Sequence, residues 1–329
     1  MVGHSPLNGD AAIAEGIDYT HGPQEYEAVG HATLTPSDGF EPRLQASPCA
    51  TMHVMMHDAS PHLPSEIVAH YATGVERPRL SGGTSRLEFA RTRLILQRFL
   101  PAPPAHILDI GGGPGLYARW LTDEGYAVRL VDAVPLHVDQ ARAASNGYTA
   151  LLGDARHLQE PDASADAVLL FGPLYHLTER ADRLRALREA SRVVRPAQPV
   201  FVAAISRFAS LLDGLWSRYL DEPAFVRIVD RDVHEGQHRN PDHRIEWFTT
   251  AYLHHPDDLA QEIRDAGLIL DAVLAVEGPG WLVPAFETRW EDDQQRHHML
   301  DAIARIEREP SILGVSAHLL AVARRPAGP

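Results

Sequence analysis

The sequence predicts an α/β fold with a mainly parallel sheet. From about residue 106 onward, apolar segments typical of buried strands alternate with amphipathic helices. A glycine-rich turn, residues 111–115, joins the first strand of this region to the helix after it. Strands that alternate with helices at this spacing form right-handed βαβ units, so neighbouring strands run parallel.

Two helices are expected before the alternating region, over residues 65–72 and 87–99. The second has one apolar stripe and stops at Pro101, because proline cannot continue a helix. Strands are then expected at residues 106–110, 127–131, 148–152, 165–171 and 200–205. The helices that alternate with them are expected at residues 116–122, 135–144 and 180–194, the second with Pro135 at its start. A last helix and two strands follow at residues 260–266, 268–276 and 318–323.

Composition excludes several classes of protein. The 329 residues carry a net charge of −14, which argues against a nucleic-acid partner. The chain contains no lysine, which excludes a Walker-type phosphate loop and a Schiff-base enzyme. Cys49 is the one cysteine, so neither an intramolecular disulfide nor a cysteine zinc cluster can form. No apolar run approaches the roughly 18 residues of a membrane span, and we expect a cytoplasmic protein.

The pattern also predicts how the chain is divided. We expect a flexible tail (1–60), a helical lid (61–105), a ligand-binding core (106–205), a cap insertion (206–252) and the end of the core (253–329), which contains a second insertion (277–313). The cap insertion contains three histidines, at positions 234, 238 and 243, but a solvated loop explains them better than a metal site, and no metal is predicted.

A glycine-rich loop and three aspartates predict a site for a nucleoside-bearing ligand. Asp109 precedes the loop, whose glycines allow a ligand close to the backbone. Asp132 ends the second strand, where a carboxylate can accept hydrogen bonds from ribose hydroxyls, and Asp154 follows the third strand. The dinucleotide fingerprint fits poorly, because Leu116 stands where glycine or alanine is required and Gly115 comes one residue early.

These motifs together resemble those of class I S-adenosylmethionine-dependent methyltransferases. The resemblance covers about residues 64–325 and extends to residues 170–177, which are similar to the corresponding motif of actinobacterial small-molecule enzymes. It implies a Rossmann-like, doubly wound sheet of seven strands with an antiparallel last strand, and S-adenosylmethionine as the cofactor. The cofactor-binding residues that it implies are Asp109, Gly111, Gly113, Gly115, Asp132, Ala133, Val134, Asp154, Ala155 and Phe171.

The two insertions are rich in aromatic residues and start on the ligand side of the predicted sheet. A bulky, flat or apolar acceptor is therefore favoured over a macromolecule, although these side chains could also be the insertions' own core. The predicted acceptor-binding residues are Tyr71, Arg79, Arg207, Trp216, Trp247 and Trp281.

Methyl transfer needs a base only where the acceptor is protonated at neutral pH. His176 is the first candidate, because it follows the fourth strand and histidine titrates near that pH. Tyr175 is a positioning candidate, and His254 is a third catalytic candidate. A structural hydrogen bond would explain His176 equally well.

The sequence thus predicts a methyltransferase that acts on a small metabolite of specialised metabolism by in-line displacement. Ring-carbon methylation of the indole or pyrroloindoline type is one alternative, and a protein that binds the cofactor without catalysis is another. A dehydrogenase is disfavoured by Leu116 and Gly115. Neither a nucleic acid nor a membrane is expected as a partner, and a homodimer is left open.

Overall fold

The computed structural model describes residues 63–74, 76 and 82–328. The predicted tail over residues 1–60 and the predicted acceptor-binding Arg79 lie outside the described residues. Within the described part, no helix is both long enough and apolar enough to cross a membrane.

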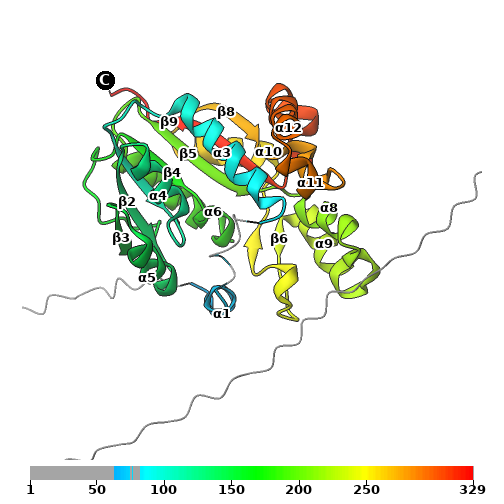
Figure 1. Cartoon of the computed structure of the whole chain (residues 1–329). Helices are drawn as coiled ribbons and strands as arrows, with labels where there is room; N and C mark the ends of the chain where they lie inside the picture. The colour runs from blue at the N-terminus through cyan, green and yellow to red at the C-terminus, as the bar shows by residue number, and fades with distance from the viewer. Residues whose placement is uncertain (1–62, 75, 77–81, 329) are drawn as a thin grey trace, which may run out of the picture. The chain divides into compact units, whose positions relative to one another are not determined.

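A seven-stranded sheet organises the structure (Figure 1), in the order β3-β2-β1-β4-β5-β9-β8. The first five strands pair in parallel, whereas β9 runs antiparallel to both β5 and β8. This confirms the predicted fold class and the antiparallel last strand. The strands are β1 (His106–Ile110), β2 (Ala127–Asp132), β3 (Thr149–Leu152), β4 (Ala167–Leu170), β5 (Pro199–Ile205), β8 (Ile269–Ala275) and β9 (His318–Arg324).

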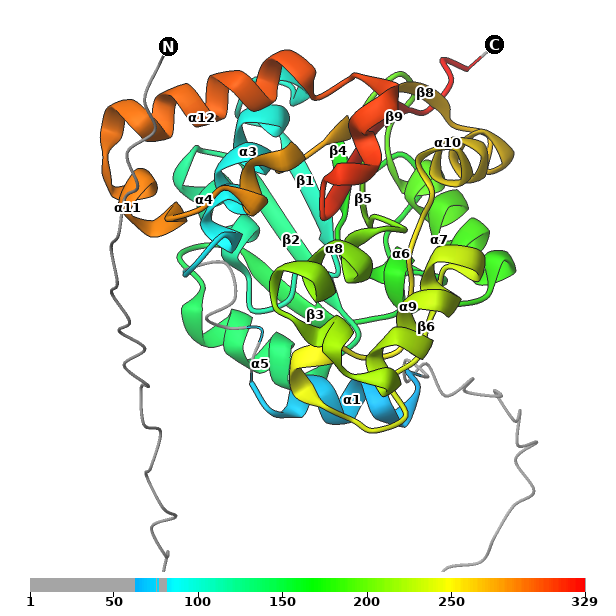
Figure 2. The ribbon, with the colours of Figure 1, turned by 90° about the vertical axis from the view of Figure 1, so that its right-hand side faces the viewer.

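Helices cover both faces of the sheet (Figure 2), which makes a three-layer arrangement. On one face, α3 (Ser85–Phe99), α4 (Leu116–Asp123) and α5 (Pro135–Ala144) pack on a core that includes Ile107 and Leu130. On the other face, α7 (Arg180–Val193) and α10 (Pro256–Asp265) pack on a core that includes Leu108, Val168 and Val202. Because both faces are buried, the central strands are almost continuously apolar, as the sequence indicates.

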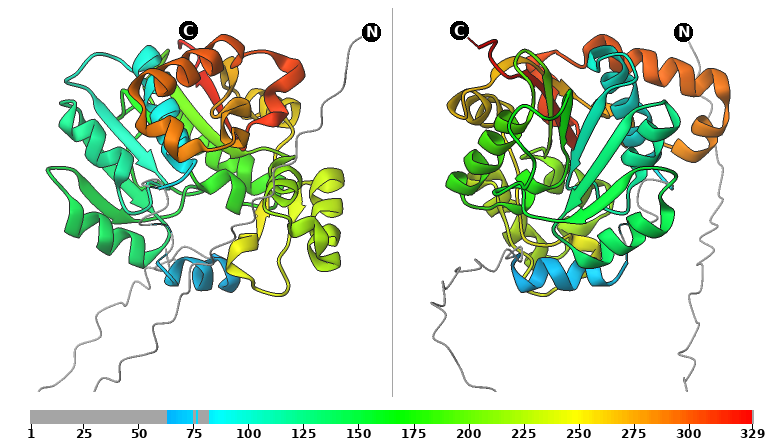
Figure 3. Two further views of the ribbon diagram at one scale, coloured as in Figure 1. Left: turned by 45° about the vertical axis from the view of Figure 1, so that its right-hand side comes forward. Right: turned by 90° about the vertical axis from the view of Figure 1, so that its left-hand side faces the viewer.

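The remaining elements gather near the carboxyl ends of the parallel strands. The short helix α6 (Pro173–His176) follows β4, and α1 (Ser65–Ala72) lies beneath the strand ends in both views of Figure 3. The first insertion contains α8 (Ala209–Trp216), η1 (Tyr219–Asp221), α9 (Pro223–Glu235), β6 (Gln237–His238), η2 (Ile245–Trp247) and β7 (Ala251–Tyr252). The second contains η3 (Gly278–Leu282), α11 (Phe286–Glu291), α12 (Asp293–Ile306) and η4 (Pro310–Val315).

Part of the aromatic content of the insertions forms their own small cores. In the first insertion Phe225 and Trp247 pack together, with ring centroids 5.3 Å apart. In the second, Phe286 stacks on Trp290 at the same centroid distance of 5.3 Å. The insertions therefore carry a packing function alongside any contact with a ligand.

Candidate functional site

The loop after β1 follows a path that only glycine allows at two positions. Gly111 has φ +76°, and a Cβ atom there would lie 2.3 Å from the carbonyl oxygen of Phe171. Gly115 has φ +92°, and its Cβ would lie 2.3 Å from the hydroxyl of Tyr148. The loop therefore packs directly on the end of β4, which keeps its backbone open to the cavity beside it.

Asp109 lies beneath this loop and is fully buried. Neither carboxylate oxygen has a hydrogen-bond partner among the described residues, and a Cβ on Gly112 would lie 2.5 Å from one of them. Burial, followed by repulsion from Asp132, raises the pKa of Asp109 to about 7. Asp109 does not line the cavities described below, so its influence on a ligand would pass through the loop.

Asp132, at the end of β2, accepts hydrogen bonds from two backbone amides that border the site. Its Oδ2 accepts from the Gly113 N–H at 2.9 Å, and its Oδ1 accepts from the Val134 N–H at 2.8 Å. The Nδ1 atom of His137 lies 3.2 Å from the same Oδ1. These bonds hold the carboxylate at the cavity wall, where it can accept from the hydroxyls of a sugar.

Asp154 follows β3 and is paired with Arg156. The guanidinium donates to both of its carboxylate oxygens, at 2.6 Å from Nη2 to Oδ2, and also to Asp182 at 2.9 Å. Burial would raise the pKa of Asp154, but the bonds from Arg156 outweigh it and lower the pKa overall. Asp154 and Ala155 both line the cavity at the strand ends.

Three cavities adjoin one another along the carboxyl ends of the strands. The strand-end cavity is bounded by the ends of β1, β2 and β3 and by α1. The loop cavity lies between the glycine loop and the residues of α3 and β9. The aromatic cavity extends under the first insertion and is walled by Tyr71, Tyr175, Phe225, Trp247, Phe248 and Trp281. Tyr175 lines all three, so the cavities meet at this side chain.

His176 is engaged through both ring nitrogens. Its Nε2 lies 2.6 Å from the Tyr71 hydroxyl, and its Nδ1 lies 3.2 Å from the Thr250 carbonyl oxygen. Since a carbonyl only accepts, Nδ1 carries the proton and Nε2 accepts from Tyr71. Burial lowers the pKa of His176 to about 4, so the imidazole is neutral at pH 7 and a weak base.

The structure brings together most of the predicted site residues. The strand-end cavity is lined by Gly111, Gly113, Asp132, Ala133, Val134, Asp154 and Ala155, together with Tyr175 and His176. Phe171 lines the loop cavity, and Tyr71, Trp247 and Trp281 line the aromatic cavity. Gly115 contacts Tyr148 behind the loop and lines none of the three.

Besides Asp109 and Gly115, three predicted catalytic or acceptor-binding residues line none of these cavities. His254 is fully buried and faces Glu262, with 3.4 Å between Nε2 and Oε2, so we withdraw it as a catalytic candidate. Arg207 donates to the Leu253 carbonyl and to Asp258, which leaves it in a structural role. Trp216, at the end of α8, is 55% exposed and lines none of the three cavities.

Three further residues were not predicted as a site. Glu88, Glu277 and His318 offer ligand atoms that all lie within 4.8 Å of one another. They come from α3, the end of β8 and the start of β9, and His318 lines both the loop cavity and the aromatic cavity. The available signal was positional: Glu277 directly follows one predicted strand, and His318 begins the next.

Comparison with known proteins finds similarity in the sheet core. Residues 108–202 match the family model "Methyltransferase domain". Uncharacterized methyltransferases from Mycobacterium bovis and Mycobacterium tuberculosis are 39% identical over 97 residues, which is 30% of this chain and 38% of theirs. A malonyl-[acyl-carrier protein] O-methyltransferase from Methylococcus capsulatus is 34% identical over 105 residues, 30% of this chain and 37% of that one. The chain thus spans about two fifths of the length of these curated relatives.

Solved structures share the fold. One is from the Haloferax volcanii complex that contains the Trm112 methyltransferase activator, with a TM-score of 0.52 and 20% identity, covering 80% of this chain and 100% of that one. Another, from Listeria monocytogenes, is assigned to the S-adenosylmethionine-dependent methyltransferases. It has a TM-score of 0.50 and 18% identity and covers 73% of this chain and 98% of that one. These likenesses show that the chain shares the fold of these structures.

The methyltransferase domain indicates that the chain binds S-adenosylmethionine. The residues present fit this cofactor in two respects. Gly111 lets the loop pack against Phe171, and Gly111 and Gly113 both line the strand-end cavity, where a ligand can approach the loop. The same cavity is lined by the acidic Asp132 and by the apolar Val134, a pairing suited to a ribose and an adjacent flat base.

Proposed function

We propose that the protein is a methyltransferase that transfers the methyl group of S-adenosylmethionine to a small aromatic acceptor. The observation that carries the proposal is the junction at Tyr175, where the strand-end cavity adjoins the aromatic cavity. A donor on one side and an acceptor on the other would be held next to each other with little water between them.

The donor is assigned to the strand-end and loop cavities. Gly111 and Gly113 would face its methionine part, Asp132 its ribose, and Val134 and Ala155 its adenine. S-adenosylmethionine supplies an electrophilic methyl group and leaves as S-adenosylhomocysteine. The protein's share of catalysis is to bind, to align the two reactants and to exclude water.

The acceptor is assigned to the aromatic cavity. Trp247 and Trp281 form part of its wall, and the indole N–H of Trp281 donates to the Val315 carbonyl at 2.9 Å, which fixes that ring. Flat aromatic walls favour a flat or apolar ligand. This composition supports a small metabolite as the substrate class, and ring carbon, oxygen and nitrogen acceptors all fit it.

His176 enters the proposal in a narrower role than the sequence suggested. A histidine with a pKa of about 4 and with both nitrogens bonded has little capacity to take a further proton. Its bond to Tyr71 instead joins α6 to α1 at the boundary between the cavities. We assign His176 to positioning.

Calorimetric titration with S-adenosylhomocysteine tests the donor half of the proposal, with NAD as the control ligand. Micromolar binding of the first alone supports the assignment, and no binding by folded protein overturns it. A panel of phenols, indoles and aryl amines, screened by mass shift, tests the acceptor half. Donor binding without a methylated product would favour a non-catalytic binding protein.

A further inference from the structure

The aromatic cavity has an acidic wall. Among the residues that the structure describes, its lining includes the carboxylates of Glu76, Asp213 and Glu246 and contains no arginine. The chain carries 30 basic residues besides histidine, all of them arginine, so their absence from this described wall is a local feature of the cavity. The charge of the wall therefore bears on which acceptor the cavity takes.

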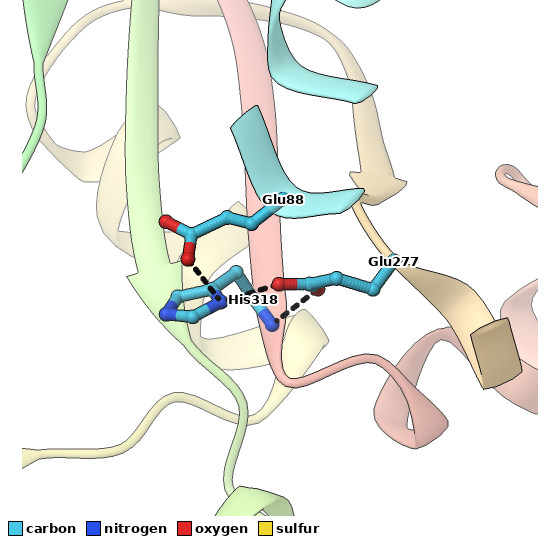
Figure 4. A group of neighbouring side chains, drawn as sticks. All are labelled: Glu88, Glu277 and His318. Carbon is cyan, nitrogen blue, oxygen red and sulfur yellow. Dashed lines mark hydrogen bonds and ion pairs between the residues drawn. The ribbon is translucent and has the colours of Figure 1, made fainter. Parts of the chain in front are cut away.

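Two histidines line the same cavity, and each lies against a carboxylate of its own. Nδ1 of His238 lies 2.8 Å from Oδ2 of Asp232. Nδ1 of His318 lies 2.6 Å from Oε1 of Glu277, a pair that Figure 4 shows. A positive charge on either ring is thus balanced by its neighbour and does not offset the charge of Asp213.

Asp213, on α8, forms no ion pair with any residue in the described part of the chain. Its side chain accepts one hydrogen bond, from the Ser217 hydroxyl to Oδ1 at 3.0 Å. By contrast, Glu246 is paired with Arg244, with 2.5 Å between Oε1 and Nη2. Burial raises the pKa of Asp213, and the bond from Ser217 offsets only part of this effect. The Asp213 carboxylate is therefore partly desolvated and lacks a compensating positive charge.

Ser210 provides a second polar group on the same helix. It comes one turn before Asp213, and both residues line the aromatic cavity. The Ser210 Oγ is buried and has no hydrogen-bond partner among the described residues, which is a state that a bound ligand can relieve. Because residues three apart lie on one face of a helix, Ser210 and Asp213 offer acceptor oxygens to the same ligand group.

A protonated amine suits these groups. An ammonium group donates up to three hydrogen bonds and brings the positive charge that Asp213 lacks. The aromatic rings of the same wall attract a cation through their electron-rich faces, and they include Tyr175, Phe248 and Trp281. An anionic ligand would instead be repelled by Asp213, and a neutral ligand would leave that carboxylate desolvated without a partner.

We infer that the acceptor carries a protonated amine, which Asp213 and Ser210 bind. This inference rests on the proposed function and narrows its acceptor to aromatic compounds with a cationic side chain. Neither Asp213 nor Ser210 lines the strand-end cavity or the loop cavity, which are assigned to the donor. The amine is therefore bound away from the donor, and the aromatic end of the acceptor faces Tyr175.

The amine acts as an anchor and another atom of the acceptor takes the methyl group, because a protonated nitrogen has no lone pair. In the transfer, the bond between sulfur and the methyl carbon breaks and its electron pair stays on sulfur. An electron pair of a ring carbon, or of an oxygen or nitrogen at the aromatic end, forms the new bond. The proton displaced from that atom is released to solvent.

Two series of acceptors that differ in side-chain charge test the inference. Tryptamine, 3-propylindole and indole-3-acetate carry a cationic, a neutral and an anionic side chain on the same ring, and tyramine, 4-propylphenol and 4-hydroxyphenylacetate form the matching phenol series. We expect wild-type kcat/KM for the amine to exceed that for the neutral analogue about tenfold or more, with the anion lowest. A charged hydrogen bond to a partly desolvated carboxylate accounts for this order.

Asp213→Asn removes the charge, keeps the side-chain size and can still accept from Ser217. It should bring kcat/KM for the amine to within about twofold of the neutral analogue, and leave turnover of the neutral analogue and S-adenosylhomocysteine affinity within about twofold of wild type. Asp213→Glu, which keeps the charge, should retain part of the preference. Asp221→Asn is the matched control, because its side chain is 65% exposed, pairs with Arg218 and lines none of the three cavities.

Calorimetry on the complex with S-adenosylhomocysteine gives a readout that needs no turnover. The amines should bind more tightly than their neutral analogues to wild-type protein but not to Asp213→Asn. Equal kcat/KM across a series, preference for the anion, no binding of either amine, methylation on the amine nitrogen, or an amine preference that survives in Asp213→Asn would each overturn the inference and leave the proposed function intact. Failure of folded wild-type protein to bind S-adenosylhomocysteine would remove the proposed function and the inference with it.

Discussion

The Tyr71 hydroxyl lies 2.6 Å from Nε2 of His176, a contact between residues that are 105 positions apart. Tyr71 belongs to α1 and His176 to α6, and both side chains line the strand-end cavity. The bond joins the N-terminal helix to the segment that follows β4. Part of the wall of the strand-end cavity is therefore formed by α1, a helix that does not pack in the layers covering the sheet.

His176→Ala should lower kcat about tenfold and leave S-adenosylhomocysteine affinity within twofold, because the side chain positions Tyr71 and does not hold the donor. The pH profile of kcat should keep its wild-type shape, since His176 is not the group that takes the proton. Steady-state kinetics across pH checks this. A profile that loses its acidic limb in His176→Ala would restore His176 as the base.

Tyr71→Phe should lower the free energy of unfolding by about 1 kcal/mol, because Nε2 of His176 would lose its donor in a partly buried place. Urea denaturation measures the change. Tyr126→Phe is the matched control, since its hydroxyl donates to the Pro101 carbonyl at 2.9 Å, away from the cavities. Loss of acceptor affinity in Tyr71→Phe but not in Tyr126→Phe would place Tyr71 in the acceptor wall.

Asp132→Ala should weaken S-adenosylhomocysteine binding at least tenfold, which corresponds to about 1.4 kcal/mol. The substitution removes both the predicted ribose contact and the bond that holds the Gly113 N–H. Calorimetry measures the affinity. Asp139→Ala on α5 is the control, because that carboxylate is 75% exposed. Equal affinity in the two variants would show that the ribose site is assigned wrongly.

Gly111→Ala should abolish donor binding, because its Cβ would lie 2.3 Å from the Phe171 carbonyl oxygen and the loop would have to move. Gly267→Ala is the matched control. Gly267 has a comparable φ of +85°, but no atom lies within 4 Å of the added Cβ. The pair separates the steric effect from backbone strain, and calorimetry with S-adenosylhomocysteine compares them. Intact binding in Gly111→Ala would show that the loop tolerates displacement.

Asp109 should make stability fall as pH rises. Its folded pKa of about 7 lies above the unfolded value of about 4, so between these values the folded state holds a proton that the unfolded state has lost. The contribution of Asp109 to the free energy of unfolding is fully present below about pH 4. It declines by up to about 1.4 kcal/mol per pH unit until about pH 7. Asp109→Asn should remove this part of the decline. Urea denaturation at pH 5 and pH 8 should show a smaller difference for Asp109→Asn than for the wild type, and an equal difference would contradict the buried, protonated carboxyl.

Local signals in the sequence predicted much of the sheet core. The helix over residues 135–144 has the same bounds in the structure, because Pro135 marks its start and an apolar stripe marks its buried face. The strand over residues 106–110 is equally well defined by the proline-rich segment before it and the glycine loop after it. Aspartates at strand ends located the strand-end cavity, since parallel strands bring their carboxyl ends to one edge.

Contacts between distant segments were the part that sequence could not supply. His254 follows β7 like a site residue, but the bridge between Ser206 and His254 places it in the interior beside Glu262. Glu277 and His318 meet because β8 and β9 pair antiparallel, and the register of that pair depends on a bulge between Leu270 and Ala272. A residue pattern read along the chain contains neither of these facts.

The way in which α1 is attached distinguishes local opening of the ligand site from global unfolding of the protein. Besides the Tyr71 bond, Thr249 and Thr250 donate to the backbone carbonyl and the carboxylate of Glu66, at 3.2 and 3.1 Å. Detachment of α1 would break these bonds and the packing of Ile67 and Tyr71 on Val134 while the strands stay paired, so we expect it to cost less free energy than global unfolding. Backbone amides of α1 would then exchange their hydrogens with solvent faster than those of β1, and the rate at which α1 detaches would limit how quickly a product can leave.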